Sequence, residues 1–137
     1  MHSTITLLIL SFIASIAAPA AAQTPQELLE GAYWAVAING QPIPAPSPTE
    51  DGVVVHEIAV LIKEDGRFTM KVRASARGQA EHERWSGGTY TVTGDTLVVT
   101  PGPNSVEREV VRFRWRLDGD VLWLYDEHGH EYRFLQA

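Results

Sequence analysis

The chain has 137 residues, a formal net charge of −6 and no cysteine. The acidic charge argues against nucleic acid or anionic lipid as the main partner, because both are themselves negatively charged. The lack of cysteine excludes disulfide bonds, cysteine-ligated metals, thiol chemistry and lipid attachment at a cysteine.

The first 22 residues have the pattern of a secretory signal peptide. Residues 5–17 are mostly apolar, and residues 20–22 are three alanines that can precede a cleavage site. A retained membrane anchor is the alternative, but two serines and Pro19 interrupt the roughly 20 apolar residues that it needs. We therefore expect cleavage after Ala22, one mature domain over residues 23–137, and a periplasmic or secreted location.

Residues 86–100 contain the clearest hairpin pattern in the mature chain. Two alternating runs flank Gly94-Asp95, and such a two-residue link suits a type II′ turn. Pairing outward from this turn places four apolar side chains on one face: Tyr90, Val92, Leu97 and Val99. A slip of one residue would turn all four to water, so the register is strongly specified.

The rest of the mature chain is predicted to consist of one short helix and further strands. A capping-box pattern beginning at Thr24 predicts a helix that ends at Gly31. Alternating runs predict strands over residues 33–38, 53–63, 67–76, 110–117, 121–125 and 130–134. A proline at every second position from Pro42 to Pro48 predicts a stiff surface loop, with a proline-rich recognition motif as the alternative.

About eight strands in simple succession predict an all-β fold. No helical pattern or long crossover separates them, so we expect an antiparallel up-and-down barrel with a short N-terminal helix. Closing the sheet into a barrel removes both unpaired edges. A two-sheet β-sandwich is the alternative.

Several segments resemble the small bacterial secreted lipocalin-like proteins of the calycin superfamily. These segments are Trp34 and residues 38–42, 64–68, 86–92, 117–124 and 130–134. The resemblance implies an eight-stranded barrel that can enclose a small, mostly apolar ligand. The chain departs from lipocalins in two ways: their Gly-X-Trp is one residue longer here, from Gly31 to Trp34, and the predicted register turns Arg133 outward, away from that tryptophan.

The predicted registers of three neighbouring strands place two polar side chains inside the barrel. His56 and Glu83 lie on either side of Ala74, where they could orient a ligand or act as acid and base. A hydrogen-bonded pair at the wet mouth of the barrel is the alternative. Pairing Val72 with Trp85 turns that tryptophan inward and requires a β-bulge at Gly87-Gly88.

Side-chain size predicts a cavity at the same end of the barrel. Inward side chains shrink from Phe68 to Ala74, so we expect an open mouth there, with residues 42–48 as its rim. The predicted ligand-binding residues are His56, Met70, Val72, Ala74, Glu83, Trp85, Tyr90 and Trp115. Eight large aromatic residues predicted to face inward could instead nearly fill the barrel: Trp34, Phe68, Trp85, Tyr90, Phe113, Trp115, Tyr132 and Phe134.

Two further groups of residues could carry function. Residues 126–131 have the composition of a metal site, but a three-residue link gives His128 and His130 no shared direction, so we expect neither a metal nor another cofactor. Arg112, Arg114 and Arg116 form an outer cationic stripe near Trp123 that could bind a protein partner. Internal cation–π packing, with Trp123 held between Arg114 and Arg133, is the alternative.

Three functions follow from these residues. We expect a secreted lipocalin-like barrel, not an enzyme, that binds a small, mostly apolar ligand in its interior. The first alternative is a protein-interaction or inhibitor module that uses the outer face of Arg112, Arg114 and Trp123. The second is a small isomerase or cyclase that uses His56 and Glu83.

Overall fold

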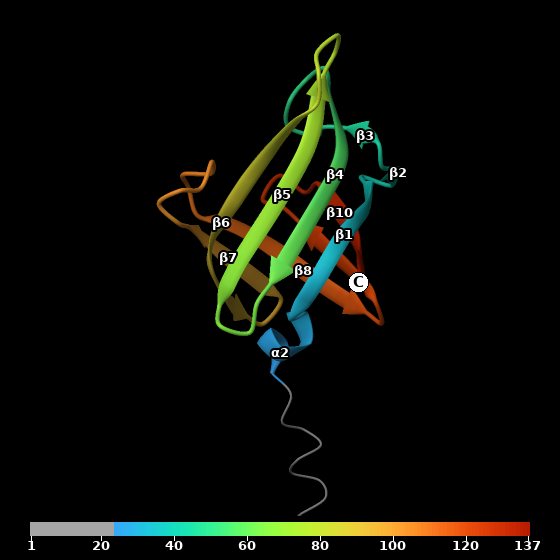
Figure 1. Ribbon diagram of the computed structural model, residues 1–137. Coiled ribbons are helices and arrows are strands. Elements are labelled where there is room, and N and C mark those ends of the chain that lie inside the picture. Colours follow the sequence, from blue (N-terminus) through green and yellow to red (C-terminus); the bar gives the residue numbers. More distant parts are fainter. Residues whose placement is uncertain (1–23) are drawn as a thin grey trace, which may run out of the picture.

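The computed structural model describes residues 24–137, so the predicted signal peptide lies outside the described residues. The described part of the chain contains one helix and ten strands (Figure 1). Their bounds are α2 Pro25–Leu29, β1 Gly31–Ile38, β2 Gln41–Pro42, β3 Ala45–Pro46, β4 Val53–Ile62, β5 Arg67–Ala76, β6 His82–Thr93, β7 Thr96–Pro101, β8 Val111–Asp118, β9 Val121–Tyr125 and β10 Glu131–Gln136.

The eight longer strands form a closed antiparallel barrel, which confirms the predicted fold class. Neighbouring strands pair in the order β1-β10-β9-β8-β7-β6-β5-β4, and β1 also pairs with β4 to close the sheet. The two short strands, β2 and β3, lie in the proline-containing segment and pair with β1 and β4. Within residues 24–137, closure leaves no long edge strand exposed, and it excludes the two-sheet sandwich.

The end of the barrel next to α2 is closed by side-chain packing. Thr24 caps the helix by accepting a hydrogen bond from the Glu27 amide at 3.2 Å, and Leu29 is fully buried. The Tyr33 hydroxyl donates to the Leu29 carbonyl at 2.8 Å, which ties the helix to β1. Ile62, Leu97, Leu122 and Phe134 are also buried near this end, so the core fills it.

Three hairpin registers predicted from turn chemistry are confirmed. The central hairpin pairs Thr93 with Thr96 across Gly94, whose φ is +58°. The three-residue links 64–66 and 127–129 pair Ile62 with Phe68 and Leu124 with Tyr132. A fourth hairpin differs by two residues, because its link is Gly119-Asp120 and Trp115 pairs with Leu124 instead of Leu122. A shift of two keeps every side chain on its predicted face.

Three predictions about strand faces are wrong, because bulges lie elsewhere than predicted. A register shift between Ala35 and Ala37 lets Tyr33 and Ile38 both enter the core, so Trp34 faces outward and is 45% exposed. A second shift lies between Val55 and Glu57, and Val55, not His56, pairs with Ala74. The predicted bulge at Gly87-Gly88 does not form: β6 pairs without interruption, and Val72 lies opposite Arg84.

Candidate functional site

A cavity of about 340 Å³ opens at the end of the barrel opposite α2. Its deeper wall is apolar and includes Val60, Phe68, Met70, Val99, Leu124 and Phe134. Its rim includes residues 47–50, which belong to the loop between β3 and β4. Loops after β5, β7 and β9 lie at the same end (Figure 1).

The cavity lies where the inward side chains become small. Along β4 and β5, the cross-strand pairs run from Ile62 with Phe68 at the closed end to Val55 with Ala74 near the mouth. Large side chains therefore fill the base, and small ones leave space above them. The position agrees with the cavity predicted from side-chain size. Of the predicted rim, residues 42–48, only Ser47 and Pro48 line the cavity, and the lining continues to Glu50.

The predicted ligand-binding residues divide into three groups. Met70, Val72 and Ala74 line the cavity. Tyr90 and Trp115 belong to the closed end, where the Tyr90 hydroxyl donates to the Lys63 carbonyl at 2.6 Å and the Trp115 ring N–H donates to the Gly94 carbonyl at 3.1 Å. His56, Glu83 and Trp85 form the third group, and all three side chains lie on the outside of the barrel.

The outward position of Glu83 and Trp85 follows from the uninterrupted pairing of β6. Lys71 lies opposite Trp85, and its ammonium nitrogen is 5.7 Å from the centroid of the tryptophan ring. The ring N–H of Trp85 donates to Glu83 at 3.0 Å, and the side chain is 53% exposed. The lysine over the ring and the glutamate at the ring N–H therefore stabilise this tryptophan outside the core.

The same uninterrupted pairing brings two polar residues of β6 into the cavity that the predicted register had placed outside. Arg84 and Ser86 share the inner face with Tyr90, and both line the cavity. The sequence could have predicted this. Strict alternation from Tyr90 back through Gly88, without a bulge, places Ser86 and Arg84 on the inner face. Arg84 pairs with Glu50 of the rim, with 2.9 Å between the guanidinium and the carboxylate.

Asp126 and Glu107, two of the three other carboxylates that line the mouth, accept hydrogen bonds from neighbouring groups. Asp126 accepts hydrogen bonds from the amides of His128 and His130, each at 2.9 Å, and from the Tyr132 hydroxyl at 3.2 Å. Burial raises the pKa of Tyr132 well above its ordinary value, and the charge of Asp126 adds to the effect. The Glu107 carboxylate accepts from the amide of Arg108 at 3.1 Å.

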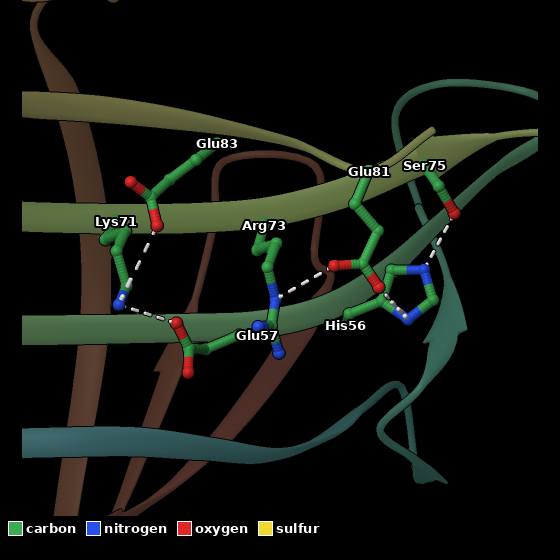
Figure 2. Close-up of polar contacts among 7 residues, drawn as sticks. All are labelled: His56, Glu57, Lys71, Arg73, Ser75, Glu81 and Glu83. Carbon is green, nitrogen blue, oxygen red and sulfur yellow. Dashed lines mark hydrogen bonds and ion pairs between the residues drawn. The ribbon is translucent and has the colours of Figure 1, made fainter. Parts of the chain in front are cut away.

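Figure 2 shows a polar network on the outer face of β4 and β5. Lys71 contacts Glu57 at 2.8 Å and Glu83 at 4.0 Å. The hydrogen bond from Lys71 lowers the pKa of Glu57 below its ordinary value. Glu83 is therefore partnered by Lys71 and Trp85 and not by His56, so the acid–base pair predicted from the sequence does not form.

His56 contacts a serine and a different carboxylate (Figure 2). Its Nε2 is 2.7 Å from the Ser75 hydroxyl, and its Nδ1 is 3.7 Å from a Glu81 oxygen. This order resembles a Ser-His-acid triad. However, the Glu81 contact is too long for a hydrogen bond, the second Glu81 oxygen lies 3.5 Å from Arg73, and none of these residues lines the cavity. The contacts fit a network that fastens the loop after β5 to β4.

The last hairpin does not gather ligands for a metal. The rings of His128 and His130 are 6.3 Å apart and tilted by 49°. Asp126 accepts hydrogen bonds from the backbone amides of both histidines and so caps this turn. Among residues 24–137, no group of three or more His, Cys, Asp or Glu side chains could hold a metal ion.

Trp123 lies on the outer face, as predicted, and one of its two predicted arginine neighbours differs. Arg116 and Arg133 are its cross-strand neighbours, and the Arg116 guanidinium is 4.0 Å from the ring centroid. Of the two predicted neighbours, Arg133 is therefore found, whereas Arg114 lies opposite Tyr125. The two-residue shift in the link between β8 and β9 accounts for the exchange.

No helix within residues 24–137 is long and apolar enough to cross a membrane. No protein-family model matches the chain, and no curated protein sequence matches it.

Proposed function

We propose that this protein is an exported, lipocalin-like carrier that binds a small, mostly apolar ligand in the cavity of its barrel. The observation that carries the proposal is the cavity itself, with an apolar wall and a mouth surrounded by loops. Its volume of about 340 Å³ is at the lower end of the roughly 300–1,000 Å³ usual for small-molecule sites. Export is supported by the apolar segment before Gln23.

The size of the cavity limits the affinity that burial can provide. Each methylene removed from water contributes about 0.8 kcal/mol, so a ligand that buries eight to ten methylenes gains about 6–8 kcal/mol. Part of this gain offsets the lost freedom of the ligand. We therefore expect dissociation constants in the micromolar range or weaker for a simple hydrocarbon chain.

The test is to fill the cavity by mutation and to measure the binding of a neutral fluorescent probe such as N-phenylnaphthylamine. Ala74→Trp and Ser86→Trp each add a large side chain to the lining, from β5 and β6 respectively. Thr91→Trp is the control, because Thr91 lies on the exposed outer face of β6. We expect weak or no probe binding in the first two variants and unchanged binding in the third. If the wild-type protein binds no probe, or if both cavity variants bind as well as the control, the proposal is wrong.

A second candidate function uses the outer surface of β8. Arg112, Arg114 and Arg116 are all exposed, and no ion pair of theirs occurs in the described part of the chain. A cationic stripe on an otherwise acidic protein favours a module that docks an acidic protein surface. A variant with Arg112→Glu and Arg114→Glu should then lose its partner in crosslinking experiments and still bind the neutral probe.

A further inference from the structure

Arg84 gives the cavity a single point of positive charge. Its position opposite Val72 directs the side chain to the inner face of β6, between the apolar wall and the mouth. Among the residues that the structure describes, it is the one basic side chain that lines the cavity. An arginine at this place is notable because every inner neighbour along β5, from Phe68 to Ala76, is apolar.

A carboxylate of the protein itself is hydrogen-bonded to this arginine. Glu50 approaches from the loop between β3 and β4, and its Oε1 accepts a hydrogen bond from Nη2 of Arg84 at 2.9 Å. A guanidinium carries five N–H donors, and this contact uses one of them. The contact therefore shows which chemical group fits Arg84, and it leaves further donors available for a second oxygen.

The loop that carries Glu50 is held by other hydrogen bonds. The Ser47 hydroxyl accepts from the amides of Thr49 at 3.3 Å and Glu50 at 3.2 Å, and the Ser47 amide donates to the Val53 carbonyl at 2.8 Å. The side chains of Arg84 and Glu50 are 42% and 47% exposed, and ion pairs this exposed contribute little to stability. Another carboxylate can therefore replace Glu50 on Arg84 while the loop keeps its fold.

We propose, building on the proposed carrier function, that the ligand is an amphiphile with an apolar body and a carboxylate head, and that the head binds Arg84 in place of Glu50. The apolar body occupies the deeper part of the cavity, against Val60, Phe68 and Phe134. The head then lies at the mouth, where the rim loop and solvent meet. Glu50 occupies the anion site when the cavity holds no ligand.

The acidic residues of the mouth raise the alternative of a ligand with a cationic head group. Glu107, Glu109 and Asp126 also line the cavity, and a purely electrostatic mouth would prefer a cationic head. Asp126 and Glu107 already accept hydrogen bonds from their own turns, whereas the Glu109 carboxylate accepts none from the residues that the structure describes. A direct hydrogen bond to a guanidinium is stronger than the screened field of exposed charges. The carboxylate is therefore the favoured head group, and the head groups can be compared directly.

The test uses three probes with the same chain and different heads: decanoate, decanol and decyltrimethylammonium. Each displaces N-phenylnaphthylamine from the wild-type protein, which gives its relative affinity at pH 7. We expect decanoate to bind at least severalfold more tightly than decanol, and the ammonium probe to bind most weakly. Arg84→Met should lower the affinity for decanoate about tenfold or more and leave that for decanol unchanged, since one charge-assisted hydrogen-bonded contact is lost.

Two further variants identify the cause of such a change. Glu50→Gln removes the competing carboxylate and should raise the affinity for decanoate severalfold, without affecting decanol. Arg67→Met removes an exposed, ion-paired arginine from the start of β5 at the closed end of the barrel and should change neither affinity. Unchanged decanol binding by Arg84→Met also shows that this variant is folded.

The outcomes separate this inference from the carrier function. If decanol and decanoate bind equally, if the ammonium probe binds most tightly, or if Arg84→Met binds decanoate as well as the wild type does, the carboxylate inference is overturned and the carrier function stands. If no probe enters the wild-type cavity, the carrier function fails, and this inference fails with it.

Discussion

Gly88 on β6 is the position where a single methyl group should do most damage to the barrel. A Cβ atom at Gly88 would overlap the carbonyl oxygen of Thr100, and it would lie 2.9 Å from the carbonyl carbon of Thr100 and 3.0 Å from the amide nitrogen of Gly102. All three atoms belong to the backbone, so none can rotate away. The end of β7 and the start of the following loop would have to move from β6.

The cost of Gly88→Ala can be estimated from this geometry. Overpacking usually costs about 1–3 kcal/mol when side chains can adjust, and here the backbone must adjust, so we expect about 3 kcal/mol. The urea midpoint should then fall by about 1–3 M, and the melting temperature by roughly 10–20 °C for a domain of this size. Probe binding should also weaken, because Gly87 holds the loop of the mouth through a hydrogen bond from Gly102 at 2.8 Å.

Gly87→Ala is the matched control for this experiment. An added Cβ at Gly87 would meet only the Phe68 carbonyl oxygen within 4 Å, at an ordinary contact distance of 3.5 Å. Replacing glycine by alanine also restricts the unfolded chain, which favours the folded state by up to about 1 kcal/mol. We therefore expect equal or slightly higher stability. Equal urea midpoints for the two alanine variants would refute the close approach of β6 and β7.

Three more predictions test other parts of the molecule. Trp123→Ala should lower the free energy of unfolding by about 0.5–1 kcal/mol through the lost stacking on Arg116, as measured in urea; a loss above about 3 kcal/mol would instead place the ring in the core. Burial raises the pKa of Tyr33 from 10.0 to about 12, so the unfolded chain ionises first and stability should fall between pH 10 and pH 12. Tyr33→Phe should make this decline shallower, and an unchanged slope in alkaline unfolding experiments would contradict the assignment. A fluorophosphonate probe, which modifies activated serines, should leave Ser75 unlabelled because Glu81 is 3.7 Å from the His56 ring; labelling of the wild type but not of Ser75→Ala would establish a working triad.

Turn chemistry made much of the barrel predictable. A glycine at the position that needs positive φ fixes each of the links at Gly66, Gly94 and Gly129, with φ of +85°, +58° and +82°. Once the link is fixed, the period of two assigns a face to each residue of both strands. The central hairpin and the pairing of Ile62 with Phe68 were predictable for this reason.

The bulges in β1 and β4 could not be predicted, because the residues beside them are apolar on both faces. Residues 53–55 are three valines, so the pattern before His56 does not show which of them faces the core. Tyr33 and Trp34 pose the same problem in β1, because both are large and aromatic. In each strand the bulge becomes visible only when the partner strand supplies the register. The inside position of Tyr33 is stabilised by its hydrogen bond to the Leu29 carbonyl, which is a tertiary contact.

The position of Trp85 shows why apolar character alone is a poor guide to the inner face. The prediction placed this tryptophan inside and added a bulge to accommodate it. In the structure, Lys71 packs on its ring and Glu83 accepts its N–H, and these contacts stabilise it on the surface. Lys71 reaches the ring only because β5 pairs with β6 in this register, so the sequence of β6 alone does not show that the ring is stable on the surface.

Shifts of one residue in β4 and β6, the two strands on either side of β5, decide the chemistry of the mouth. A regular β4 and a bulged β6 would place a histidine and a glutamate in the cavity, which together suit proton transfer. The observed bulge in β4 moves His56 outside, and the regular β6 moves Arg84 inside. A permanently charged guanidinium cannot exchange a proton near neutral pH, but it can bind a carboxylate through several hydrogen bonds. The bulge in β4 and the absence of one in β6, and not the composition of the strands, therefore decide that an arginine and not a histidine–glutamate pair lines the mouth.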